Sequence, residues 1–214
     1  MQLNSIFVGK PKDVPYNGKI ISTSIYKELV SGPVRVVKHN IEGDQQANLE
    51  VHGGEYKAVY AYPVEHYDFW RNSRADLSFE PGVFGENLSV SGLFEDEVNV
   101  GDVYKIGTAT FAVTTPRLPC FKLGIKMNDP GIIKDFMAAM RSGFYLKVVE
   151  EGVIEAGDEI VLLKKDDYGL TIKELVKLQS TDKSNKQLLK KAIEAPALQK
   201  DWVDSFKEKL DKLK

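Results

Sequence analysis

Short apolar runs separated by glycine-containing turns fill the chain from Gln2 to about Lys165. The runs are enriched in Val, Ile, Tyr, Phe and Thr, which favour extended backbone and pack well on a pleated surface. We expect strands in eight ranges: 3–8, 34–38, 57–62, 98–100, 103–106, 110–114, 144–149 and 159–163. So many short strands predict a mainly β fold, in the form of a barrel with a few helices.

Two helices are expected between these strands, each beginning at a proline. After Pro63, apolar residues at helical spacing would face the core, with His66 turned toward solvent. After Pro130, an apolar and methionine-rich stripe continues to Gly143, where a glycine favours a helix end. Stripes of this kind are usually core-packing surfaces, so neither helix is assigned a cofactor role.

After Lys165, helical periodicity replaces the strand-like runs. Thr171 and Glu174 have the spacing of a capping box, and residues 184–187 repeat that spacing. A third helix is expected from Pro196, because apolar residues recur every four positions after it. We therefore predict two domains: a β-barrel domain over residues 1–165 and a small all-α domain of three helices over residues 166–214.

Composition places the chain among ordinary globular proteins. It has 214 residues, 43% of them hydrophobic and 28% charged, and 29 basic against 31 acidic side chains leave a net charge of −2. Without an excess of positive charge, we expect no nucleic-acid partner held by phosphate contacts. The C-terminal helices do not change this expectation, because after Lys165 the chain has 11 lysines, 9 acids and no arginine, the residue that most often reads bases.

The sequence also limits the compartment in which we expect the protein. No apolar stretch approaches the roughly 18 residues that a membrane helix requires, and the N-terminus shows no basic segment followed by an apolar run. We therefore expect a cytoplasmic protein with no membrane partner. The single cysteine, Cys120, cannot form an internal disulfide, which agrees with a reducing compartment. The sequence indicates no particular oligomeric state.

Several familiar catalytic motifs are absent from the sequence. It has no Gly-x-x-x-x-Gly-Lys phosphate loop, no Gly-x-Gly-x-x-Gly after a strand, no Cys-x-x-Cys and no His-Glu-x-x-His. Its three histidines, His39, His52 and His66, do not form a spaced cluster, so we expect no zinc site. Enzymes that depend on ATP, a dinucleotide or zinc are therefore disfavoured.

The cysteine lies in a stiff, basic loop after a predicted strand, where residues 114–123 read Thr-Thr-Pro-Arg-Leu-Pro-Cys-Phe-Lys-Leu. Two prolines limit the freedom of this loop, while Arg117 and Lys122 would favour the thiolate form of Cys120. A thiolate is a suitable ligand for a soft metal. The alternative, which stays open, is a cysteine that packs as a small apolar side chain.

Two polar loops accompany this cysteine in the sequence. The first ends in Gly53 and Gly54, followed by Lys57, and successive glycines allow backbone amides to converge on an anion. The second places Glu86 and Asn87 between glycines, a pair able to hydrogen-bond a heterocycle. A plain surface loop and a plain turn are the alternatives for these two segments.

The order of four sequence blocks resembles the MOSC family (molybdenum cofactor sulfurase C-terminal domain), and within it the YiiM-like bacterial members. The blocks are Gly-Asp-Gln-Gln-Ala-Asn followed by His-Gly-Gly, then Phe-Gly-Glu-Asn-Leu, Pro-Arg-x-Pro-Cys-x-Lys-Leu, and Ser-Gly-Phe-Tyr. The likeness covers about residues 1–165, and the C-terminal helices resemble a three-helix extension of some members. It implies a MOSC-type β-barrel that binds molybdenum cofactor, a pterin dithiolene with a phosphate tail.

The resemblance also implies roles for individual residues. Cys120 matches the protein ligand of the metal, and Arg117 would balance the negative charge of the cofactor, so both are expected to act in catalysis. The cofactor-binding residues that it implies are Asp44, His52, Gly53, Gly54, Lys57, Glu86, Asn87, Arg117 and Lys122. Two positions depart from the family pattern: Thr115 replaces a usual glutamine and Asn48 replaces a usual aspartate.

The activity implied by the resemblance is the reductive removal of oxygen from N-hydroxylated small molecules, such as hydroxylaminopurines and hydroxylamines. A separate flavin- or iron–sulfur-type reductase would donate the electrons, and the oxygen would leave as water. Two alternatives stay open. The protein could carry the cofactor or a sulfur atom without turnover, or it could be a thiol enzyme in which His52 activates Cys120.

Overall fold

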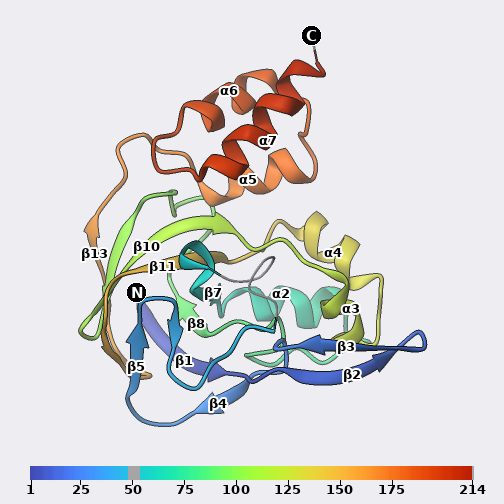
Figure 1. The fold of residues 1–214 in the computed structure, drawn as a ribbon, viewed down its shortest axis with the longest axis vertical. Coiled ribbons are helices and arrows are strands. Elements are labelled where there is room, and N and C mark those ends of the chain that lie inside the picture. Colours follow the sequence, from blue (N-terminus) through green and yellow to red (C-terminus); the bar gives the residue numbers. More distant parts are fainter. Residues whose placement is uncertain (48–53, 214) are drawn as a thin grey trace.

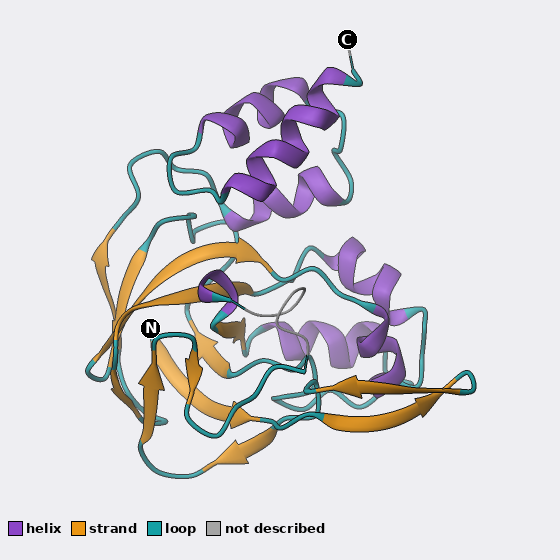
Figure 2. Cartoon of the chain, in the orientation of Figure 1, coloured by secondary structure: helices purple, strands orange, loops and turns teal. Residues whose placement is uncertain are grey.

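The computed structural model contains 31% strand and 27% helix, and it describes residues 1–47 and 54–213. The fold is therefore mixed α/β, and the prediction of a mainly β protein was wrong. Helices that the apolar pattern did not reveal, such as the one that follows Cys120, account for part of the difference. Figure 2 shows the helices in two groups, one beside the strands and one at the C-terminal end.

Thirteen strands occur in the described residues. They are β1 (Gln2–Val8), β2 (Lys12–Tyr16), β3 (Lys19–Thr23), β4 (Glu28–Val30), β5 (Val34–Val37), β6 (Asn40–Ile41), β7 (Val59–Pro63), β8 (Leu88–Ser91), β9 (Val103–Ile106), β10 (Ala109–Pro116), β11 (Phe144–Glu150), β12 (Gly152–Ile154) and β13 (Ile160–Lys164). The helices are η1 (Glu55–Lys57), a 3-10 turn, and α2 (His66–Ser73), α3 (Phe121–Met127), α4 (Ile132–Ala139), α5 (Ile172–Gln179), α6 (Lys186–Glu194) and α7 (Lys200–Asp211).

Within the described residues, the strands form one large sheet and two small ones. The large sheet has the order β13-β9-β10-β11-β7-β8-β1-β4, and β12-β5-β6 and β2-β3 form the others. Neighbouring strands are antiparallel except β7 and β8, which are parallel. The hairpin β2–β3 extends to one side of the molecule, below helix α3 in Figure 1.

The large sheet is not closed into a barrel, which corrects the sequence prediction. The first residues of β1 meet the segment before β13 at an isolated bridge between Gln2 and Glu159, supported by a 2.9 Å bond from the Leu3 amide to the Asp158 carbonyl. The second half of β1 instead pairs with β4, through residues such as Ile6. Because β4 occupies this edge of β1, the contact between β1 and the segment before β13 stays an isolated bridge with a few hydrogen bonds and does not become a ladder.

Three other local predictions were also wrong. The range 98–100 is not a strand, because its backbone bonds to residues 170–172 around an isolated bridge between Asn99 and Thr171. His66 does not face solvent: it is buried, and its Nε2 lies 2.7 Å from Glu95. The preceding proline ends β7, so α2 begins three residues later than predicted.

The three predicted C-terminal helices are present as α5, α6 and α7. The capping box of α5 forms as expected, since Thr171 accepts a bond from the Glu174 amide and Glu174 accepts one from the Thr171 amide. Asn185, rather than the residue before it, caps α6. Apolar residues of these helices, including Leu175 and Phe206, belong to the same buried cluster as the sheet. The structure therefore shows a shared core, and the proposed domain boundary after residue 165 stays a prediction.

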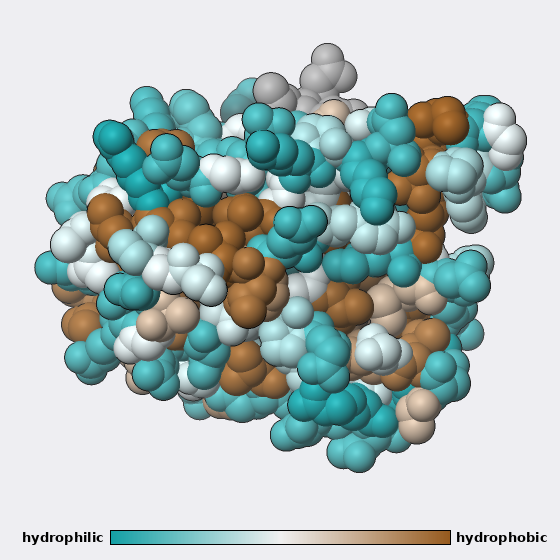
Figure 3. Space-filling model, turned by 90° about the horizontal axis from the view of Figure 1, so that it is seen from below, coloured by the Kyte–Doolittle hydropathy of each residue, from teal (hydrophilic) through white to brown (hydrophobic). Residues whose placement is uncertain are grey.

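A second buried cluster fills the space between β7 and helices α2 to α4. It is mainly aromatic, with Trp70 stacked between Phe79 and Phe136 at ring-centroid distances of 5.5 and 6.0 Å. Seen from below, the molecular surface is mostly polar with apolar areas between the polar side chains (Figure 3). No described helix combines the length and the apolar character needed to cross a membrane.

Candidate functional site

A cavity of about 110 Å³ lies where several loops meet beside strands β7 and β11. Its described lining comes from the end of β3, the loops before β4 and η1, the turn before β8, and the loop that carries the cysteine. The lining residues are Thr23, Ser24, Ile25, Lys27, Asp44, Gln46, Ala47, Lys57, Tyr60, Phe84, Gly85, Asn87, Arg117, Leu118, Cys120, Lys122 and Tyr145. Six of the residues predicted from the sequence are therefore brought together: Asp44, Lys57, Asn87, Arg117, Cys120 and Lys122.

Cys120 lies at the junction between strand and helix. Strand β10 ends at Pro116, a short loop with a second proline follows, and α3 begins directly after Cys120. The Cys120 carbonyl accepts a 2.9 Å bond from the Leu123 amide, which fixes the turn into the helix. The thiol is free and half-buried, so it is reachable from the cavity and is not sealed in the core.

Arg117 is a buried cation in the cavity wall, with 5% of its surface exposed. Its Nη2 donates a 3.2 Å bond to the Phe84 carbonyl, and the guanidinium lies 5.0 Å from the ring centroid of Phe136 and 5.6 Å from that of Tyr60. Its Nη1 is buried and finds no hydrogen-bond partner among the described residues. A buried cation without a carboxylate is costly, so this nitrogen favours an anionic ligand in the cavity.

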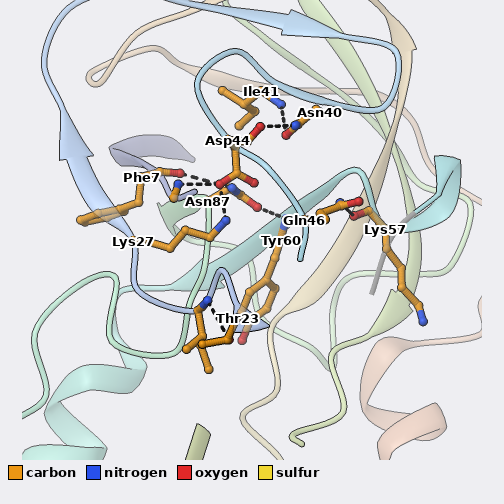
Figure 4. A network of polar contacts seen from close by, with 12 residues as sticks. Phe7, Thr23, Lys27, Asn40, Ile41, Asp44, Gln46, Lys57, Tyr60 and Asn87 are labelled. Atoms are coloured by element: carbon orange, nitrogen blue, oxygen red, sulfur yellow. Dashed lines mark hydrogen bonds and ion pairs between the residues drawn. The ribbon is translucent and has the colours of Figure 1, made fainter. Parts of the chain in front are cut away.

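A buried ion pair forms a second part of the wall. Lys27 contacts Asp44, which also accepts a 2.6 Å bond from the Gly9 amide. Figure 4 shows Lys27 pointing toward Asp44, with Asn87 beside this pair and Gln46 closer to Lys57. Burial lowers the pKa of Lys27, although the charge of Asp44 opposes this effect. In the described structure, Asp44 therefore fixes the position of Lys27 and of the backbone at Gly9.

The charges around the cavity are unbalanced. Its described lining has one carboxylate, Asp44, and four cations: Lys27, Lys57, Arg117 and Lys122. Behind the wall, Lys126 donates bonds of 2.9 and 2.8 Å to the carbonyls of Ile25 and Gly82, and its burial lowers its pKa to about 8. Asp44 and the carboxylate of Glu86, which is also behind the wall, offset part of this positive charge. The cations still outnumber the carboxylates, and this excess would attract an anion and stabilise it once bound.

Glu86 and Asn87 take different places in the structure. Asn87 lines the cavity, where its Oδ1 accepts a 3.1 Å bond from the Tyr60 amide and its Nδ2 donates a 3.2 Å bond to the Phe7 carbonyl. Glu86 is fully buried and is absent from the described lining. It accepts bonds from the Tyr67 hydroxyl and, at 2.6 Å, from the Gly82 amide. Glu86 thus holds the turn that shapes the cavity, and direct contact with a cofactor stays a prediction.

The glycine-rich loop is only partly within the described structure. His52, Gly53 and Asn48 lie outside the described residues. Gly54 precedes η1 with a φ of 90°, a left-handed conformation that favours glycine, and it does not line the cavity. Lys57 is the member of this loop that the structure places in the cavity wall.

Two tyrosines complete the wall, and sequence reasoning did not identify them as site residues. Tyr60 donates a 2.8 Å bond from its hydroxyl to the Ser142 carbonyl, and Tyr145 packs beside it with a ring-centroid distance of 5.5 Å. Burial raises the pKa of both phenols, so both keep their proton at neutral pH. The Ser-Gly-Phe-Tyr block contained the signal for Tyr145, whereas Tyr60 looked like any other strand residue.

A second cavity, of about 400 Å³, opens on another side of the cysteine. Cys120, Lys57, Leu118 and Tyr145 line both cavities. The remaining walls of the second cavity come from the end of β10 and from helices α5 and α7. Its other lining residues are Thr115, Pro116, Pro119, Gln179, Asp201, Trp202 and Ser205.

Comparison with known protein families finds a match over the part of the chain that contains the cysteine loop. The model of the MOSC domain matches residues 48–161, which include the cysteine loop and more than half of the chain. The chain belongs to the MOSC family. Members of this family are associated in general with binding of molybdenum cofactor.

Individual relatives of this MOSC protein support the assignment to the family. It is 36% identical to YflK of Bacillus subtilis (strain 168) over 98% of this chain and 94% of that protein. The crystal structure of YiiM from Geobacillus stearothermophilus superposes with a TM-score of 0.81 at 37% identity, covering 98% of both chains. A protein of Gibberella moniliformis (strain M3125 / FGSC 7600) named "Reductase" is 34% identical over 76% of this chain, which spans 29% of that protein.

The wall of the first cavity fits an anionic cofactor. Two residues of the lining, Arg117 and Ser24, have a buried polar atom without a hydrogen-bond partner among the described residues. These atoms are the Nη1 of Arg117 and the hydroxyl oxygen of Ser24. A single thiol, Cys120, is accessible beside them. This donor set suits a group that is negatively charged and accepts one protein sulfur ligand.

Proposed function

We propose that this MOSC protein binds molybdenum cofactor through the sulfur of Cys120 and reduces N-hydroxylated small molecules. A separate flavin- or iron–sulfur-type reductase supplies the electrons. The overall reaction is R–NHOH plus two electrons and two protons giving R–NH₂ and water, so the N–O bond breaks and the nitrogen is reduced. When bound, the cofactor supplies a redox-active metal with an exchangeable coordination position.

The observation that carries this proposal is the buried guanidinium of Arg117 beside Cys120. Its Nη1 lacks a protein partner among the described residues, and the same cavity has four cations against one carboxylate. The dithiolene and phosphate of molybdenum cofactor are anionic, so they would compensate this charge. Membership of the MOSC family and similarity to a protein named "Reductase" support the same conclusion.

Some residues of the chain would bind the cofactor, and others would shield it from solvent. Cys120 supplies the protein ligand, and Arg117, Lys27 and Lys122 balance negative charge. Tyr145 lines both cavities beside Cys120, and its raised pKa keeps the phenol protonated. It therefore shields the sulfur of Cys120 from solvent without adding a charge. Low-polarity surroundings of this kind strengthen the attraction between the cations and a bound anion.

Elemental analysis of the protein made in a cofactor-competent host tests the proposal. We expect wild type to contain molybdenum and Cys120→Ala to lose most of it while remaining folded, because the sulfur ligand is removed. Circular dichroism checks the fold, and an assay with an artificial electron donor and 6-hydroxylaminopurine checks turnover. The exposed Phe121→Ala variant, next to the cysteine but outside both cavities, is a matched control and should keep its molybdenum.

The outcomes separate the possible functions. If Cys120→Ala keeps both molybdenum and activity, Cys120 is not the ligand. If wild type binds molybdenum but turns over neither hydroxylaminopurine nor hydroxylamine, the protein is a carrier. If wild type contains no molybdenum, the cofactor assignment itself is wrong.

A further inference from the structure

The second cavity joins the cysteine to the C-terminal helices. Cys120 and Tyr145 lie on one side, and Trp202, Asp201 and Ser205 of α7 lie on the other. In Figure 1, α5 and α7 lie next to the strand β10 that leads into the cysteine loop. The helices therefore form a wall of a space that reaches the candidate metal ligand.

The chemistry of this cavity differs from that of the first. Lys57 and Asp201 are its only described charged lining residues, so their charges offset one another. Its other lining is mixed: Leu118, Tyr145, Trp202 and two prolines are mainly apolar, whereas Thr115, Cys120, Gln179 and Ser205 are polar but uncharged. A neutral, flat molecule suits such a space better than a multiply charged one, because few charges here would repay the cost of desolvation.

One polar group in the cavity lacks a partner. Thr115 is 1% exposed, and its hydroxyl is buried without a hydrogen-bond partner among the described residues. Because an unsatisfied buried hydroxyl costs free energy, a ligand that donates or accepts a hydrogen bond here would gain affinity. This observation is independent of the aromatic wall and points to a ligand with a polar edge.

Trp202 is the aromatic part of the wall. Its ring packs edge-on against Phe206, with a centroid distance of 5.7 Å and an interplanar angle of 71°. Phe206 is fully buried and Trp202 packs against the main core, so the indole is held in place while remaining half-exposed. A fixed, half-exposed indole is a good platform for stacking a planar heterocycle.

We propose that α7 completes the substrate site of this protein. A planar heteroaromatic ring that carries the N-hydroxylamino group lies against Trp202, and a ring nitrogen or exocyclic group hydrogen-bonds Thr115. The N–O group then points toward Cys120, where the two cavities meet. This inference rests on the proposed function for the reaction, but it concerns which part of the chain binds the ring.

Variants of the full-length, cofactor-loaded protein test this role. Trp202→Ala removes the stacking surface, Trp202→Phe keeps an aromatic ring, and Ser205→Tyr fills the cavity without removing a contact. Glu208→Ala, an exposed position on the same helix outside the cavity, is the control. Steady-state kinetics use 6-hydroxylaminopurine and ring-free hydroxylamine, and calorimetry measures the binding of 6-hydroxylaminopurine directly.

We expect Trp202→Ala to raise KM and Kd for 6-hydroxylaminopurine about tenfold, because base stacking is lost. The molybdenum content, and the kcat and KM for hydroxylamine, should not change. Trp202→Phe should recover most of the affinity, and Ser205→Tyr should weaken purine binding like Trp202→Ala. If Trp202→Ala does not fold, the effect of Ser205→Tyr on purine binding tests the inference.

Other results would overturn the inference. Unchanged purine binding in both cavity variants, equal effects on purine and hydroxylamine, or a wild type that does not bind the purine would each do so. Failure of the proposed function looks different: wild type would lack molybdenum and turnover, while purine binding would still depend on Trp202. The two ideas are therefore separable in one set of measurements.

Discussion

The regions around Arg74 and Arg117 show two ways of treating a guanidinium. Arg74, at the end of α2, bonds Asp76 at 2.8 Å, Asp129 at 2.7 Å and Asp135, and these bonds raise its pKa. Arg117 is buried, has a carbonyl and two aromatic rings as neighbours, and keeps one nitrogen unpartnered within the described structure. The protein thus pairs one arginine with three carboxylates and surrounds the other with a carbonyl and two aromatic rings.

The largest effect is expected when the charge of Arg117 is removed, which tests the contrast between the two arginines directly. We expect Arg117→Met to lose bound molybdenum almost completely, while the free energy of unfolding of the cofactor-free protein rises by about 1 kcal/mol or more. The reason is that an uncompensated buried cation opposes folding but attracts an anion. Mass spectrometry of bound molybdenum and urea unfolding measure the two effects.

Arg74→Met is the matched control for this substitution. It should keep the molybdenum content of wild type, because Arg74 is absent from both cavities. Equal losses of molybdenum in the two variants would show that Arg117 acts only through folding. A cofactor-free Arg117→Met protein that is strongly destabilised would argue against a buried charge awaiting a ligand.

The next effect concerns Lys126, which lies behind the wall near Arg117. Its pKa is about 8 in the folded protein against an ordinary value of 10.5, because burial disfavours the charged form. The unfolded chain therefore holds this proton more tightly between those two pH values. Stability of the cofactor-free protein should rise as pH increases through this window, by about 1 to 2 kcal/mol.

Urea unfolding at both ends of this window measures the effect. Lys126→Met should abolish most of the rise, and Lys105→Met, at an exposed lysine, should not. A bound anion would favour the charged lysine, so we expect the rise to be smaller in the cofactor-loaded protein. Stability that falls across this window would contradict the burial of Lys126 as the cause.

The smallest expected effect is the loss of the Arg74 ion pairs. Hydrogen bonds from Arg74 hold the pKa of Asp76 and Asp129 below their usual range. Their stabilisation is therefore present at neutral pH and is lost as the pH falls through these lowered values. Arg74→Ala should lower the thermal midpoint slightly at neutral pH, because ion pairs that solvent reaches contribute little.

Thermal unfolding of wild type and Arg74→Ala in neutral and in strongly acidic buffer checks this sign. The difference between the two proteins should shrink in acid, where the carboxyl groups are protonated in both. A difference that grows in acid would mean that the variant acts by another route, such as altered packing of α2.

The sequence predicted best those parts of the site that are local in the chain. Arg117, Cys120 and Lys122 fall within six consecutive residues, in the loop after β10 and the first turn of α3, so their proximity follows from the covalent chain. Asn87 was indicated by its place between glycines and by the resemblance, Asp44 by the resemblance, and the structure places both in the same wall. Their functional roles stay predictions.

Site residues that are brought together only by tertiary packing were not predicted from the sequence. Lys27, Tyr60 and Trp202 lie in unrelated elements, and no motif joins them. Glu86 was predicted to meet a cofactor, but its bonds to Tyr67 and Gly82 place it behind the wall. A polar residue in a motif can support a site from below as well as line it, and spacing does not distinguish these cases.

The fold shows the same division. The capping box at Thr171 and Glu174 formed as predicted, because the bonds join residues three positions apart. The barrel did not form, because β4 pairs with β1 at the end of the sheet and leaves only an isolated bridge toward β13, a long-range pairing that the strand pattern does not reveal. The hairpin β2–β3 was missed because its exposed strands lack the apolar alternation of a strand packed against the core.

The core shared by the sheet and the C-terminal helices has a practical consequence for engineering. Shortening the chain after β13 would bare the side chains that now lie against Leu175 and Phe206, and we expect such a fragment to aggregate. Exchanging the helices between homologues would succeed only if the facing strand residues were exchanged with them. The last fifty residues are thus a structural partner of the sheet and not a removable cassette.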